Sequence, residues 1–116
     1  MATLTTQTIN RAGLGPTYGA AAGGGDAMAC GSGMFLHIKN AGGSPITVTL
    51  NVPAGRTYEP NVAITSPAIS VPATTGDRMI GPIDAATFAD PVTGLLSITY
   101  SAVTSVTVAA VNLQQP

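Results

Sequence analysis

The sequence is poor in charged residues. Only 8% of its 116 residues are charged, with four Lys and Arg against five Asp and Glu, whereas about 25% is ordinary for a soluble domain. The net charge of −1 removes the usual electrostatic attraction to nucleic acid or to an anionic membrane. We therefore expect neither of them as a partner.

Cysteine, histidine and tryptophan are also scarce. A single Cys excludes an internal disulfide framework, and one Cys with one His is too few for a side-chain zinc cage. There is no Trp, and aromatic residues make up 4% of the chain, so a platform for stacking bases is not expected. We predict no metal and no cofactor.

The chain offers few groups for catalysis. Cys30 and His37 form the one conceivable nucleophile–base pair, but we expect a half-exposed strand histidine and an unreactive thiol. The acidic residues are scattered singly beside turn or proline residues: Asp26, Glu59, Asp77, Asp84 and Asp90. Asp77 is interpreted as a turn former with a local ion pair to Arg78, so no acid–base pair is expected. The sequence predicts a protein that is not an enzyme.

Long apolar runs are missing as well. The first twelve residues contain no basic segment followed by an apolar run, which argues against a signal peptide. The stretch 95–115 has no Gly or Pro, but Ser and Thr interrupt it every second or third residue, which favours strands over a membrane helix. We expect the protein to be made in a cytoplasm and to stay soluble there.

Glycine is plentiful but unevenly distributed. Ten of the fourteen Gly lie between Gly13 and Gly43, and such segments cost much backbone entropy to order. We interpret residues 1–10 as a short strand or extended arm and 12–33 as a loop or flexible tether. The alternative is a disordered terminus. The chain thus divides into an extended N-terminal arm and Gly/Ala-rich loop, 1–33, and a β-sandwich or barrel domain, 34–116.

Alternating apolar residues predict strands after residue 33. In 34–39 the apolar positions Met34, Leu36 and Ile38 share one face, and 46–52 alternates in the same way. Turn residues separate the two, so we expect them to form a hairpin. Further strands are predicted at 68–71, 78–80, 95–100 and 105–113, and Asp84 is predicted to cap one helical turn over 85–89.

These patterns predict the fold class. Short strands with turn signals about every ten residues indicate one all-β domain, a β-sandwich or barrel of jelly-roll-like type built from short antiparallel strands, with the extended Gly-rich N-terminal arm attached. Sixteen Thr, with Ser and Asn, take the surface role that Lys and Glu usually fill.

A surface of this kind favours self-association over charge repulsion. We infer that copies of the chain or a larger partner cover much of it; the alternative is an ordinary soluble β-domain of low charge. Arg11 is the only charged residue among the first 25 and either anchors the arm to an acidic partner or is simply solvated. The candidate interface residues are Thr3, Leu4, Thr5, Thr6, Thr8, Ile9 and Arg11.

The succession of segments resembles the small head decoration (cement) proteins of tailed bacteriophages, particularly those of actinobacterial hosts. The resemblance spans almost the whole chain and rests on residues 5–13, 35–40, 44–49, 78–83, 88–94 and 97–100. It is a likeness of turns and Thr-rich strands rather than one diagnostic motif. The stretch 19–33 is the least similar part.

The resemblance implies a virion structural protein that binds the outer surface of the major capsid protein lattice and stabilises the head. It implies a homotrimer or other homo-oligomer on the capsid surface, assembled in the host cytoplasm, and it brings no catalytic residues. Two other functions stay open: another phage structural part, such as a tail, head–tail joining or fibre-base protein, and a ligand-binding β-module.

Overall fold

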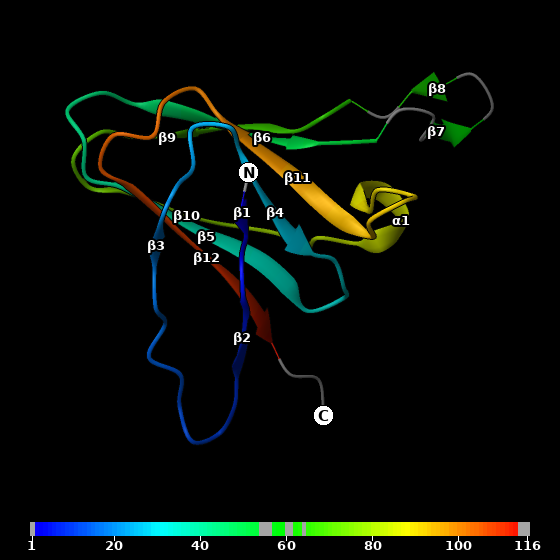
Figure 1. Cartoon of the computed structure of the whole chain (residues 1–116), viewed down its shortest axis with the longest axis horizontal. Helices are drawn as coiled ribbons and strands as arrows, with labels where there is room; N and C mark the ends of the chain where they lie inside the picture. Colours follow the sequence, from blue (N-terminus) through cyan, green and yellow to red (C-terminus); the bar gives the residue numbers. More distant parts are fainter. Residues whose placement is uncertain (1, 54–56, 60–61, 64, 114–116) are drawn as a thin grey trace.

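The computed structural model describes residues 2–53, 57–59, 62–63 and 65–113 of the chain, and two β-sheets dominate it. Sheet A contains, in spatial order, β1 (Ala2–Thr3), β4 (Asp26–Ala29), β11 (Leu95–Tyr100), β6 (Ile46–Asn51) and β9 (Ala68–Val71). Sheet B contains β10 (Gly76–Ile80), β5 (Met34–Asn40), β12 (Val106–Leu113) and β2 (Thr6–Ile9), with β3 (Gly19–Ala20) also paired to β12. A short hairpin of β7 (Thr57–Glu59) and β8 (Val62–Ala63) projects beyond the sheets (Figure 1).

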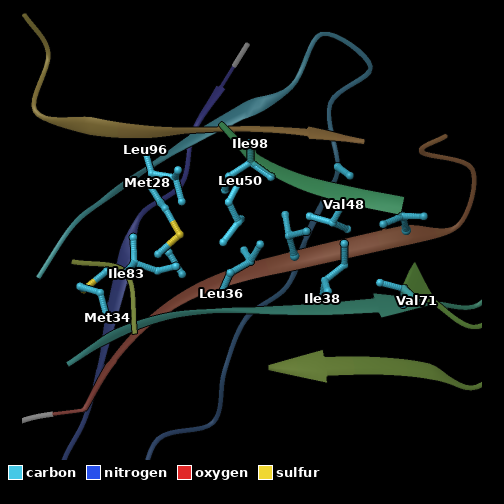
Figure 2. Close-up of a cluster of buried hydrophobic side chains, with 14 of the residues drawn as sticks. Met28, Met34, Leu36, Ile38, Val48, Leu50, Val71, Ile83, Leu96 and Ile98 are labelled. Carbon is cyan, nitrogen blue, oxygen red and sulfur yellow. The ribbon is translucent and has the colours of Figure 1, made fainter. Parts of the chain in front are cut away.

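The two sheets pack face to face, so the predicted all-β sandwich is confirmed. Leu36 and Ile38 from sheet B meet Met28, Leu96 and Ile98 from sheet A, and all five side chains are fully buried (Figure 2). Full burial of a large aliphatic side chain contributes about 1.5–3 kcal/mol. The alternating apolar positions of the sequence are therefore the ones that join the two layers.

The connection after β5 differs from the expected hairpin. β5 pairs with β10 and β12 in sheet B, whereas β6 pairs with β11 and β9 in sheet A. Residues 41–45 therefore form an arch that crosses from one sheet to the other. Alternation was enough to predict which side chains face the core, but it carries no information on which strand lies alongside.

A buried asparagine fixes this arch. Asn40 is 1% exposed, and its Nδ2 donates to the carbonyl of Ser44 at 2.9 Å and to that of Pro72 at 3.1 Å. Its Oδ1 accepts from the Gly42 amide at 2.9 Å. One side chain thus satisfies backbone groups of the arch and of the segment that follows β9.

Helix α1 (Ala85–Phe88) is a single turn, as the sequence predicts. The Asp84 carboxylate accepts from the Thr87 amide at 3.2 Å at its N-terminus, and the buried Phe88 packs into the core. Pro91, three residues beyond the helix, is incompatible with its continuation. No helix within the described parts of the chain is long and apolar enough to cross a membrane.

The first 33 residues differ from the expected arm and loop because they supply four strands to the sandwich. β1 and β2 pair in parallel with β4 of sheet A and β12 of sheet B, so the N-terminal segment crosses from one sheet to the other. β4 pairs with β11 in the body of sheet A and buries Met28 completely. Small Gly and Ala side chains around it hide this strand from a composition argument. We call residues 2–20 the strap.

Candidate functional site

The outward side of sheet A carries no charged side chain among its described positions. Residues that pair across neighbouring strands project to the same side of a sheet, and the buried Met28, Ile98 and Val48 define the inward side. The opposite side consists of Thr3, Ala27, Ala29, Thr47, Thr49, Asn51, Ala68, Ser70, Leu95, Ser97 and Thr99. We call these eleven residues the uncharged face.

Hydrogen bonds order the centre of the uncharged face. Asn51 Nδ2 donates to the Ser97 carbonyl at 3.2 Å and to the Thr99 hydroxyl at 3.3 Å. Thr47, Ser70 and Thr99 are exposed. The face therefore presents hydroxyl and methyl groups of short side chains, which lose little rotamer entropy when another surface covers them.

The outward side of sheet B is different, because the strap covers part of it. Residues between β2 and β3 fold back so that Leu14 and Pro16 lie against Phe35, Met79 and Val111 around a hollow of about 180 Å³. The Gln7 side chain holds this return: its Nε2 donates to the Thr17 carbonyl at 2.7 Å, and its Oε1 accepts from the Thr17 amide at 2.8 Å.

A chain of three polar side chains fastens the end of the strap to sheet B. The Tyr18 hydroxyl lies 2.6 Å from His37 Nδ1, and His37 Nε2 lies 2.5 Å from Asp77 Oδ1. Lys39 Nζ lies 4.3 Å from the centre of the Tyr18 ring, within range of a cation–π interaction. His37 on β5 is 7% exposed, so the expected half-exposed histidine is wrong.

This arrangement also corrects the interpretation of Asp77 and Arg78. The Asp77 carboxylate pairs with His37, and the Arg78 guanidinium donates to the Asp77 backbone carbonyl at 2.9 Å rather than to its carboxylate. Both ring nitrogens of His37 are thereby occupied, one by Tyr18 and one by Asp77. The contacts tie the strap to the sheet.

Cys30 and His37 do not form a pair. Cys30 follows β4 of sheet A, whereas both ring nitrogens of His37 are bonded on the outward side of sheet B. Burial raises the pKa of the Cys30 thiol, and a hydrogen bond from the Leu96 backbone offsets part of that effect, so the thiol is a poor nucleophile at neutral pH. No group of three or more His, Cys, Asp or Glu in the described ranges is placed to hold a metal ion.

Asp26 is a buried carboxyl group, which the sequence, with its acidic residues scattered beside turns, did not predict. It is 0% exposed; its Oδ2 accepts from the Tyr100 hydroxyl at 2.7 Å and from the Ala22 amide at 3.2 Å. Its Oδ1 has no hydrogen-bond partner among the residues that the structure describes. Burial, and then the adjacent carboxylate, raise the pKa of Tyr100 well above its ordinary value, so the phenol remains a donor. Because Asp26 lies two residues before the buried Met28 in the same strand, its side chain points to the same, inward side of the sheet. That spacing could have predicted its burial.

The predicted interface residues do not form one surface. Thr3 belongs to the uncharged face, and Leu4 packs against the core. Ile9 lines the hollow beneath the strap. Thr5, Thr6, Thr8 and Arg11 are exposed along the strap. Their contact with a partner stays a prediction.

An open apolar groove continues from the covered hollow. Phe35 and Met79 line both spaces, and Met34, Pro82 and Leu113 complete the groove of about 350 Å³. Met79 and Leu113 are 67% and 50% exposed. The side chains that line this groove include no acidic, basic, histidine or cysteine residue.

No protein-family model matches the chain, and neither a curated protein nor a solved structure matches it.

Proposed function

We propose that this chain is a virion structural protein, a capsid decoration or cement protein that binds the outer surface of a major capsid lattice and stabilises the head. The observation that carries the proposal is the uncharged face of sheet A, where eleven described side chains include no Lys, Arg, Asp or Glu. The resemblance of the sequence to head decoration proteins supports the same function.

The chemistry of the uncharged face suits a repeated, permanent contact. Burying it leaves no charge without a partner, whereas an unpaired buried charge is costly. Short hydroxyl side chains hydrogen-bond to backbone and side-chain groups of a partner with little loss of rotamer entropy. A single uncharged contact binds weakly. Many copies that bind one shell, and that also contact one another, bind with avidity.

The opposite side of the molecule favours an outward position. The strap already covers part of the outward side of sheet B, where Lys39 and Asp77 provide the charge. We therefore orient sheet A toward the lattice or toward neighbouring copies and sheet B toward solvent. The hairpin of β7 and β8 projects beyond the two sheets (Figure 1).

A copy count in purified particles, made by mass spectrometry and combined with cryo-electron microscopy, tests the proposal. Hundreds of copies forming protrusions on the shell, with sheet A against the lattice, is the expected result. A single ring or a handful of copies at the tail or the neck would replace it with the function of a tail or joining protein. Absence from the particles would overturn it.

Ionic strength provides a second readout. Binding through an uncharged face changes little with salt, whereas binding through ion pairs weakens as the Debye length falls from about 10 Å at 0.1 M to about 3 Å at 1 M. Particles stripped of the protein and incubated with it again should rebind it equally well at both salt concentrations.

A further inference from the structure

The strap is an internally bonded unit that is joined to the body by a glycine turn. The two Gln7–Thr17 hydrogen bonds lie within it. So does the turn at Asn10, whose carbonyl accepts from the Gly13 amide at 3.0 Å and whose Oδ1 accepts from the Ala12 amide at 3.0 Å. These bonds do not involve the body of the domain and therefore persist if the strap moves away.

The strap contacts the body through short strand pairings and a few side chains. β1, β2 and β3 pair with the body over two, four and two residues, and the Tyr18 hydroxyl contacts His37. Leu4 is the strap's one hydrophobic side chain that packs against the buried core among the described residues. A hollow of about 440 Å³ lies between the strap and the small side chains of β12, lined by Leu4, Gln7, Thr17 and Ala109 among others. Empty space of this kind lowers the dispersion energy that holds the strap in place.

The link between strap and body is suited to opening. Residues 22–25 form a tight turn in which the Gly25 amide donates to the Ala22 carbonyl at 2.9 Å, and Gly23 and Gly24 are exposed. Gly25 has a φ of +95°, a conformation that other residues rarely adopt. Extended, these four residues would span about 14 Å, so straightening the turn displaces the strap from its own domain.

We propose that the strap is exchanged between copies in the assembled state, so that the strap of one copy pairs with β4 and β12 of its neighbour. The neighbour's surface offers the same partners: the edges of β4 and β12, the Ala27 carbonyl that accepts from the Leu4 amide at 2.7 Å, and His37 for the Tyr18 hydroxyl. Identical contacts re-form, so exchange links the copies without requiring a new interface.

The inference rests on the proposed function, because a dense shell brings copies edge to edge. If each copy gives its strap to one neighbour and receives a strap from another, the copies form a closed ring when the rotation between them permits it. The partner is therefore a second copy of this chain, and the interaction surface is the strap-binding edge formed by β4 and β12.

An engineered disulfide distinguishes the two arrangements. Thr8 of β2 pairs with Asn112 of β12, at the spacing of about 4.8 Å between neighbouring strands that a disulfide accommodates. In the full chain carrying Cys30→Ser, Thr8→Cys and Asn112→Cys, oxidation on particles or at high protein concentration should give covalent dimers and larger species on non-reducing gels. Only monomer with an internal disulfide would overturn the exchange.

Three further variants complete the test. Ala20→Cys with Thr107→Cys, paired between β3 and β12, repeats it at a second position if the first pair fails to fold. Thr49→Cys with Thr99→Cys, paired within the body between β6 and β11, is the matched control and should give only internal disulfides. Deleting Gly23 and Gly24 shortens the turn, so the fraction of covalent oligomer should rise; an unchanged monomer would contradict the proposal.

The outcomes separate the inference from the proposed function. Hundreds of copies on the shell with only internal disulfides would overturn strap exchange and leave decoration intact. Covalent oligomers of a protein that is absent from particles would support exchange and remove the decoration role.

Discussion

The Tyr100 hydroxyl donates to the carboxylate of Asp26 at 2.7 Å inside the sandwich, and Asp26 is 0% exposed. The two residues come from β11 and β4, which lie side by side in sheet A. The bond therefore joins two adjacent strands from the core side, where an ionised carboxylate without a donor would be strongly unfavourable.

Tyr100→Phe should destabilise the fold. The variant keeps the ring but removes the donor to Asp26, which leaves a buried acceptor less satisfied and costs about 1–3 kcal/mol in the free energy of unfolding. Urea denaturation followed by circular dichroism measures the loss. Thr47→Val, at an exposed position on the uncharged face, is the control and should change stability by less than about 0.5 kcal/mol; equal losses in both variants would contradict the role of the bond.

Stability should fall at alkaline pH because of the same phenol. The pKa of Tyr100 is raised in the folded state, whereas in the unfolded chain it returns to about 10. The folded state therefore binds the proton more tightly, and its stability is full below pH 10 and declines above it by about 1.4 kcal/mol per pH unit for one group. Denaturation midpoints between pH 8 and 11 should show this decline in the natural protein and a shallower one in Tyr100→Phe.

Asn40→Ala should loosen the arch between β5 and β6. The substitution removes the donor to the Ser44 and Pro72 carbonyls and the acceptor for the Gly42 amide, so the expected loss is about 2–3 kcal/mol. Asn51→Ala removes a half-buried amide on the uncharged face and serves as the control. If thermal denaturation gave the same midpoint for both variants, the arch would not depend on Asn40.

Tyr18→Phe should free the end of the strap without unfolding the sandwich. The variant retains the ring beneath Lys39 but loses the hydroxyl that hydrogen-bonds to His37, a loss of about 1 kcal/mol. Limited proteolysis should cleave the variant faster within residues 10–18, while the denaturation midpoint moves little. Unchanged cleavage, compared with Thr104→Ala as a control in an exposed loop, would mean that other contacts hold the strap.

Charge placed on the uncharged face should block attachment to particles. Thr47→Glu combined with Thr99→Glu adds two exposed carboxylates and should leave the free energy of unfolding within about 0.5 kcal/mol per site. Burying them would cost several kcal/mol, so rebinding to stripped particles should fall at least about tenfold. Thr104→Glu, in the loop between β11 and β12, is the matched control and should rebind normally.

The sequence was sufficient to predict the fold class and most strands, because alternating side chains reveal which faces are buried. It predicted β9, β10, β11 and β12 closely, and the helical turn at Asp84. Strand partners could not be derived, as the arch after β5 demonstrates, since alternation does not encode neighbours. β4 was hidden by the glycines around it, and the Tyr18–His37–Asp77 chain joins three segments that only the folded chain brings together.

The order of strands in sheet B also affects how the protein is made. β12 is the last of the described strands in sequence, yet it lies between β5 and β2 and also pairs with β3. Until residues 106–113 have left the ribosome, β5 and the strap have no common partner. Sheet B can therefore form in full only after its final strand has been synthesised, and its long-range pairings make it a late step in folding.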